Sequence, residues 1–156
     1  MSGYWTWNRP QAKRRGCLAL RAATSSVRLR RILLIDDTPE IAQLLTYALC
    51  DRGYEVFATG YTDDLNELIV EQRADAVVID CSTFDMSESL FDILRDDPAH
   101  AEFPVVLISD TPEDADASLQ SREARKVMLI PKPFSGAQVA RALDELLGPK
   151  SGAMVG

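Results

Sequence analysis

Four short runs of apolar residues, separated by segments with helical spacing, constrain the fold of this chain more than any other feature. The runs are Ile32–Ile35, Ala76–Ile79, Val105–Ile108 and Val127–Ile130, and a weaker one covers Tyr54–Ala58. Continuous apolar runs of this length are typical of strands that are buried on both faces, as in a parallel sheet. The segments between them repeat apolar residues every three or four positions, which predicts helices. The alternation therefore predicts a three-layer α/β domain in which helices cover both faces of a five-stranded parallel sheet.

Local signals place the ends of several of these helices. Thr38-Pro39 is expected to begin the first helix, with the Thr38 hydroxyl as its cap and proline in its first turn. Ser135 and Gln138 have the spacing of a capping box that opens the last helix. The helix that follows Thr111 has few apolar residues, and we therefore expect it to be exposed or mobile.

Charge divides the chain into two parts. Residues 1–31 contain eight Lys and Arg residues and no acid, whereas residues 32–156 contain nine basic residues and all 24 acidic ones. We interpret residues 1–29 as a basic, disordered N-terminal arm, residues 30–148 as the folded domain and residues 149–156 as a flexible tail. An acidic body suits cations or basic partners, so nucleic-acid binding is expected, if at all, only through the arm. No apolar run approaches the ~20 residues of a membrane span, and we expect a cytoplasmic protein with no membrane partner.

The cysteines and the single histidine narrow the chemistry. Cys17, Cys50 and Cys81 are odd in number and have no short paired spacing, which favours reduced thiols over bridges or zinc ligands. Cys81 is expected to be a buried structural thiol. His100 lies in a polar stretch and is expected in a surface loop, which argues against His-rich metal sites and Ser-His-Asp catalysis.

Polar side chains follow the apolar runs. Asp36-Asp37 follow the first run, Asp80 follows Ala76–Ile79, Ser109 follows Val105–Ile108, and Lys132 comes just after the last. Ligands of open α/β sheets bind beyond the carboxyl ends of the strands, so these side chains should converge at one edge. Three close carboxylates repel one another, and a divalent cation such as Mg²⁺ removes the conflict. With Mg²⁺ and the lysine to neutralise phosphoryl oxygens, a carboxylate could act as the nucleophile and form an aspartyl phosphate.

The same residues, with Lys132-Pro133-Phe134 after the last run, resemble the receiver domain of two-component response regulators over roughly residues 30–148. The resemblance implies a flavodoxin-like fold with strand order 2-1-3-4-5 and five helices. It implies that Asp80 accepts a phosphoryl group, which Ser109 and Lys132 contact. It also implies an Mg²⁺ site made by Asp36, Asp37, Asp80 and the backbone carbonyl of Ser82.

The resemblance extends to partners. It implies that a histidine kinase or a histidine phosphotransfer protein donates the phosphoryl group, and that the chain is a phosphoacceptor rather than a turnover enzyme. The face formed by the fourth helix, the last strand and the last helix would then bind a downstream effector protein differently. Because no output domain follows residue 148 in this sequence, we expect the effect to pass through another protein, and a homodimer is left open.

The sequence departs from the usual receiver pattern at positions near the acceptor. These are the loop 81–85, which lacks a proline, Glu88 in place of a glycine, Asp110 in place of a small residue, and Leu129 in place of an aromatic residue. By its charge, Asp110 should slow phosphorylation or alter attack by water, and Leu129 removes the usual aromatic coupling. Asp110, Leu129 and the altered loop support an alternative, in which the chain is a degenerate receiver that acts as a phosphorylation-independent interaction module. A small phosphohydrolase is disfavoured, because such enzymes usually place a second Asp where this chain has Ser82.

Overall fold

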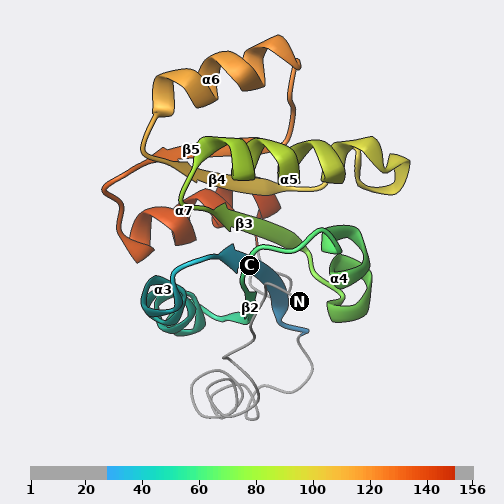
Figure 1. Cartoon of the computed structure of the whole chain (residues 1–156). Coiled ribbons are helices and arrows are strands. Elements are labelled where there is room, and N and C mark those ends of the chain that lie inside the picture. Colours follow the sequence, from blue (N-terminus) through green and yellow to red (C-terminus); the bar gives the residue numbers. More distant parts are fainter. Residues whose placement is uncertain (1–27, 150–156) are drawn as a thin grey trace.

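The chain forms a five-stranded parallel sheet with the strand order β2-β1-β3-β4-β5, which confirms the order expected from the sequence (Figure 1). The computed structural model describes residues 28–149, so residues 1–27 of the predicted arm and 150–156 of the predicted tail lie outside the described residues. The strands are β1 (Arg30–Asp36), β2 (Tyr54–Thr59), β3 (Ala76–Asp80), β4 (Val105–Ser109) and β5 (Val127–Pro131). Each predicted strand is therefore present and ends one residue beyond the apolar run, at a polar residue in every strand except β5, which ends at Pro131.

Within residues 28–149, five α-helices and one short 3-10 helix accompany the strands, and the last α-helix follows the last strand. They are α3 (Pro39–Asp51), α4 (Leu65–Gln72), α5 (Phe84–Asp96), η3 (Pro98–His100), α6 (Pro112–Ser121) and α7 (Gly136–Leu147). The apolar residues of α3 and α7 pack with one face of the sheet, and those of α4, α5 and α6 pack with the other. In this part of the chain no helix is long and apolar enough to span a membrane.

Of the two helix caps predicted from the sequence, the cap of α7 is present and the cap of α3 is not. The predicted capping box of Ser135 and Gln138 opens α7. The Thr38 hydroxyl makes no capping hydrogen bond, so that prediction is wrong. The backbone N–H of Thr38 instead donates to Asp36 Oδ1 at 2.9 Å, because the carboxylate at the end of β1 lies within reach of the loop.

A close approach between α3 and α7 sets the position of the β5–α7 loop. A Cβ atom added at Gly136 would lie 2.4 Å from the Cβ of Ala48 in α3, which is too close for any side chain. Glycine at the first position of α7 therefore allows the two helices to meet. The contact keeps the loop with Lys132 beside α3, and the same loop lines a surface groove with α3.

His100 is buried, which contradicts the surface position expected from the sequence. Its Nδ1 lies 2.7 Å from Asn66 Oδ1 of α4, and its ring contacts Phe103 edge-on with the ring centroids 5.3 Å apart. The 3-10 turn that ends at His100 directs the ring inward, so a polar stretch of sequence contributes to the packing between α4 and α5.

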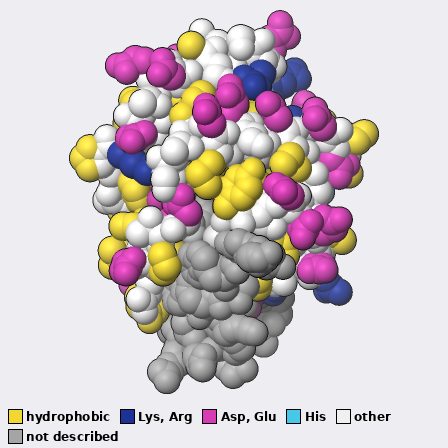
Figure 2. Space-filling model, in the orientation of Figure 1, with side chains coloured by type: hydrophobic (Ala, Val, Ile, Leu, Met, Phe, Trp, Pro, Cys, Tyr) yellow, Lys and Arg dark blue, Asp and Glu magenta, His cyan; other side chains and the backbone are white. Residues whose placement is uncertain are grey.

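Helix α6 is attached to the domain by two apolar side chains, the buried Ala115 and the partly buried Leu119, and by a set of charged side chains beside them. Ala115 is its only buried residue. Its neighbour Arg122 forms ion pairs with two residues of α5, Asp92 at 2.8 Å and Glu88 at 3.1 Å, and Glu88 also accepts a hydrogen bond from Ser118 at 2.7 Å. We call this set of Glu88, Asp92, Ser118 and Arg122 the Arg122 clamp. The exposure expected for α6 is confirmed, and Figure 2 shows acidic side chains spread over the face in view, with few basic ones among them.

The turn after α6 contains two strained residues. Glu123 and Lys126 have φ values of 49° and 56°, in the left-handed region that costs an ordinary residue roughly 1–2 kcal/mol. Strained backbone persists where the surroundings hold it in place. The Arg122 clamp lies directly beside this turn and supplies such restraint.

We predict that Arg122→Ala loosens α6 while leaving the sheet intact. Hydrogen exchange followed by mass spectrometry should show faster exchange in residues 112–124, and denaturant unfolding should show a loss of about 0.5–1.5 kcal/mol, because a part-exposed network contributes little more than one exposed pair. Arg125→Ala is the matched control, since its ion pair with Glu102 is exposed on both sides. Equal exchange rates in the two variants would contradict the role of the clamp.

Candidate functional site

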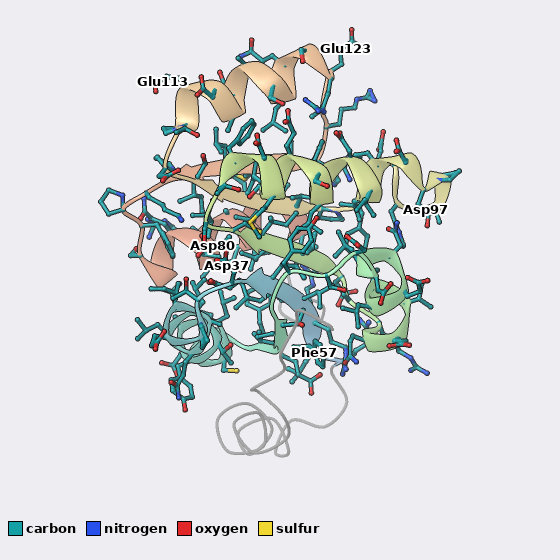
Figure 3. The ribbon with its side chains drawn as sticks, viewed as in Figure 1. Asp37, Phe57, Asp80, Asp97, Glu113 and Glu123 are labelled. Carbon is teal, nitrogen blue, oxygen red and sulfur yellow. The ribbon has the colours of Figure 1, made fainter. Side chains whose placement is uncertain are left out.

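The carboxyl ends of the strands bring the predicted site residues together. Asp36 and Asp80 lie opposite each other in the β1–β3 register, and Ser109 ends the neighbouring strand β4. All three side chains are buried although they are polar. Figure 3 shows Asp37 and Asp80 close together where β1 and β3 end. The sequence therefore predicted this convergence from the strand assignment alone.

Lys132 reaches the site from the loop after β5. Its Nζ lies 3.1 Å from Asp80 Oδ1, and its backbone N–H donates to the Ser109 carbonyl at 2.8 Å. The Lys132–Pro133 peptide is cis. Burial lowers the pKa of Lys132, but the negative charges of Asp80 and Asp110 outweigh burial, so the pKa lies above its usual value. The lysine is therefore a permanent cation beside the carboxylate of Asp80.

Asp36 is the most confined acid of the site, with 1% of its surface exposed. Burial, followed by the close approach and negative charge of Asp80, raises the pKa of Asp36 to about 8. Its Oδ2 is buried and has no hydrogen-bond partner among the described residues. A buried carboxylate oxygen without a donor is costly, and a proton or a cation would remove the cost.

Asp37 is held by the loop that follows Asp80. The Ser82 backbone N–H donates to Asp37 Oδ2 at 2.9 Å, and the Ser82 hydroxyl donates to the same oxygen. Within residues 28–149, no three His, Cys, Asp or Glu side chains stand together ready to bind a metal ion. The structure thus brings Asp36 and Asp80 together and engages Asp37 with Ser82.

The donor set fits Mg²⁺. The unpartnered Oδ2 of Asp36 beside Asp80 is the hard, negatively charged oxygen environment that this ion prefers. Asp36, Asp37, Asp80 and the Ser82 carbonyl are the groups that would hold it, and Asp37 would have to turn from Ser82 to take part. Sequence reasoning missed this engagement of Asp37, because a hydrogen bond between loops 45 residues apart leaves no local pattern.

Ser109 connects the site to helix α6. Its hydroxyl oxygen accepts the backbone N–H of Thr111 at 2.9 Å, and Thr111 precedes the first residue of α6. Thr111 makes no side-chain cap, so Ser109 supplies the oxygen that the helix entrance uses. Any rotation of this hydroxyl toward Asp80 would remove a hydrogen bond at the entrance of α6.

The residues that depart from the usual receiver pattern lie in different parts of the structure. Asp110 is exposed and acts on the site through its charge on Lys132. Leu129 packs, partly buried, with the apolar cluster under α4, α5 and α6. Glu88 belongs to the Arg122 clamp. The residues that replace the usual ones therefore alter charge at the acceptor and the attachment of α6.

Of the predictions for the cysteines, the one for Cys81 is confirmed and the one for Cys50 is wrong. Cys81 is a free, buried thiol, as expected, and burial raises its pKa to about 12. Cys50 is disulfide-bonded, so the prediction of three reduced thiols is wrong. Cys17 lies outside the described residues.

A surface groove of about 700 Å³ lies next to Lys132. It runs between α3 and the β5–α7 loop, and its lining residues are mostly apolar: Ile41, Leu44, Leu45, Ala48, Lys132, Pro133, Phe134 and Gly136. Leu44 is 65% exposed although it belongs to the apolar pattern of α3. The sequence places Ile41, Leu44, Leu45, Ala48 and Leu49 at helical spacing, as one apolar stripe. Its breadth, with Leu44 and Leu45 adjacent, is the signal that one edge of α3 faces solvent.

A family model and a curated relative both connect this chain with response regulators. The family model for the response regulator receiver domain matches residues 32–144. The phosphate regulon transcriptional regulatory protein PhoB of Pseudomonas aeruginosa is 26% identical over 119 residues, which cover 76% of this chain and 52% of that protein. The chain therefore spans about half the length of this curated relative.

Solved structures show the same fold. A sensor protein from Polaromonas sp. JS666 matches with a TM-score of 0.66 and 22% identity, over 76% of this chain and 95% of that one. The receiver domain of sensor histidine kinase PA1611 from P. aeruginosa, which has a magnesium ion in its active-site cleft, matches with a TM-score of 0.60 and 21% identity, over 78% and 100% of the two chains. The fold and strand-end carboxylates define a receiver-type signalling domain. The chain belongs to the response regulator receiver domain family.

We predict that Asp36→Asn stabilises the metal-free protein, increasingly so as the pH rises. Because the pKa of folded Asp36 is about 8, above the ordinary 3.8, the parent should lose stability as the pH rises from about 4 to about 8. Asparagine carries no charge, so the variant should unfold at a higher temperature by pH 8, a gain of roughly 1–3 kcal/mol.

Thermal melts from pH 4.5 to 8.5, in EDTA and in excess Mg²⁺, would check this. Mg²⁺ should stabilise the parent at pH 8 more than the variant. Asp63→Asn, at an exposed position, is the control and should change little. A difference between parent and Asp36→Asn that does not depend on pH would contradict the assignment of the titration to this residue.

Proposed function

We propose that this protein is a phosphoacceptor of two-component signalling, and that Asp80 takes the phosphoryl group from a phosphohistidine of a partner protein. The observation that carries the proposal is the position of Asp80: it is buried, in register with Asp36, and paired with Lys132 at 3.1 Å. A buried carboxylate is thus held beside a fixed cation, and phosphoryl transfer requires positive charge at the reacting group. Membership of the receiver family supports the same role.

The transfer step uses the residues of the strand ends. A carboxylate oxygen of Asp80 attacks phosphorus, the P–N bond to the donor histidine breaks with its electron pair left on nitrogen, and the imidazole takes a proton from solvent. Lys132, which pairs with the carboxylate of Asp80 before transfer, would pair with the phosphoryl oxygens after it. The Ser109 hydroxyl is placed to donate to one of these oxygens after it releases Thr111. Mg²⁺, when bound, would neutralise further negative charge on the phosphoryl group.

The added charge gives the domain a second state. An acyl phosphate adds a charge comparable to the ≈ −1.5 to −2 of other phosphorylated side chains. Recruiting Ser109 would free the N–H of Thr111 at the entrance of α6. We propose that the face made by α6, β5 and α7 then binds a downstream effector protein differently. A shift from 1:99 to 99:1 requires about 5.5 kcal/mol of differential binding.

The groove beside Lys132 is the proposed docking site of the histidine-bearing partner. It is apolar and open, and one of its walls, Lys132, also contacts Asp80. A partner helix seated against Leu44 and Phe134 would lie next to the acceptor, as transfer from a histidine requires. A cytoplasmic location, where such partners act, is part of the same proposal.

A second candidate function is a degenerate receiver that binds its partner without phosphorylation. The engagement of Asp37 by Ser82 favours it, because that carboxylate is not ready to bind metal. The additional negative charge of Asp110 favours it as well. The two candidates differ in whether Asp80 gains a phosphoryl group.

We predict that the protein gains one phosphoryl group on incubation with acetyl phosphate and Mg²⁺. Intact mass measurement should show the gain in the parent, and none in Asp80→Asn or in EDTA. Asp110→Ala should increase the initial rate by about two- to tenfold, because it removes a nearby like charge from the path of the anion. Absence of any gain in both the parent and Asp110→Ala would favour the degenerate receiver.

We predict that Leu44→Asp impairs transfer from a phosphorylated histidine phosphotransfer protein by tenfold or more, while the rate with acetyl phosphate stays within about twofold, because only the protein donor uses the groove. Val70→Asp is the matched control, since Val70 in α4 is 68% exposed and lies away from the groove. Equal transfer rates in the two variants would show that the groove is not the docking site.

A further inference from the structure

Asp37 is bound by two donors of one residue. Both the N–H and the hydroxyl of Ser82 point to Asp37 Oδ2, and the N–H contact is 2.9 Å long. Ser82 itself is exposed, two residues after Asp80, and precedes Thr83, which caps α5.

The oxygen that Ser82 engages belongs to the carboxylate that would join Asp36 and Asp80 in holding a metal ion. Asp36 and Asp80 lie opposite each other on adjacent strands, and Asp37 is the third carboxylate at this edge. An oxygen that accepts two hydrogen bonds has less electron density and less free space for a cation. A metal ion would therefore compete with the donors of Ser82 for Asp37.

We propose that Ser82 is a positioning residue that holds Asp37 out of the metal site and thereby weakens Mg²⁺ binding. This inference rests on the proposed function, because it concerns the metal affinity of the same acceptor site. It adds a residue whose side chain acts on metal binding through Asp37, whereas the earlier assignment gave Ser82 only a backbone carbonyl role.

The release of Asp37 has a second consequence. When Asp37 turns to the metal, the Ser82 hydroxyl and N–H lose their acceptor next to Asp80. Both donors then lie within the loop that follows the acceptor and are available to an anionic oxygen there. Coupling of this kind is reciprocal, so an anion that takes these donors should also favour the metal-bound position of Asp37.

We predict that Ser82→Ala changes the affinities for Mg²⁺ and for beryllofluoride in opposite directions. Ser82→Ala removes the hydroxyl donor, so Mg²⁺ should bind about three- to tenfold more tightly than to the parent, in line with the loss of one hydrogen bond. Beryllofluoride, a phosphoryl analogue, should bind at saturating Mg²⁺ at least threefold more weakly, because its oxygen-like fluorines lose the same donor. A purely structural role would not change the two affinities in opposite directions.

The experiment is isothermal titration calorimetry of the full chain with MgCl₂, followed by beryllofluoride. Ser82→Thr keeps the hydroxyl and should restore both affinities to within about twofold of the parent. Thr83→Ala removes the neighbouring hydroxyl, which bonds Met86 and not Asp37, and is the matched control. Asp37→Asn shows whether the ion binds at this site.

Equal or weaker Mg²⁺ binding by Ser82→Ala, with binding that still depends on Asp37, would overturn the inference and leave the proposed function standing. Absence of Mg²⁺ binding in the parent and in Ser82→Ala, together with no phosphoryl gain at Asp80, would overturn the proposed function and this inference with it. Tighter Mg²⁺ binding with weaker beryllofluoride binding would support it.

Discussion

Two carboxylates placed side by side in a buried position are the constraint on which the rest of this structure depends. Asp36 and Asp80 end adjacent strands in register, and the sheet leaves them almost no contact with water. Like charges at such a position cannot both be ionised without compensation. The surrounding features are the compensation: the ammonium group of Lys132, the N–H of Thr38 and, in the proposed active form, a divalent cation. A site of this kind is poised for added positive charge, and so it can respond to a metal ion or to a change in phosphorylation.

The site is also connected to the helices that surround it. Asp36 accepts the N–H that precedes α3, and Ser109 accepts the N–H that precedes α6. In both places a threonine at the helix entrance contributes its backbone, while its hydroxyl makes no cap. The helix that lines the proposed docking groove and the helix on the proposed output face therefore start from hydrogen bonds to acceptor-site side chains. A change at one strand end can be transmitted along two separate paths.

Much of this arrangement could be predicted from the sequence, because it depends on periodicity. Unbroken apolar runs identified the strands, and the polar residue after each run identified the site. The engagement of Asp37 by Ser82 and the burial of His100 could not be predicted, since each depends on segments that meet only after folding. The groove was missed for a different reason: the apolar pattern of α3 does not distinguish a residue that faces the core from Leu44 at its solvent edge. The Cys50 bond was also missed, because spacing along the chain says little about distance in space.

Helix α6, which lies on the proposed output face, contributes little to the buried core. Its hold on the core consists of the buried Ala115, the partly buried Leu119 and a set of surface charges, while α5 contributes four buried residues. Substitutions on the outer side of α6 can therefore accumulate at little cost to the folded state. Because surface charge pairs are weakened by dissolved ions, the freedom of this helix also varies with the salt content of its surroundings. An element with these properties can acquire a new partner while the acceptor chemistry beneath it stays the same.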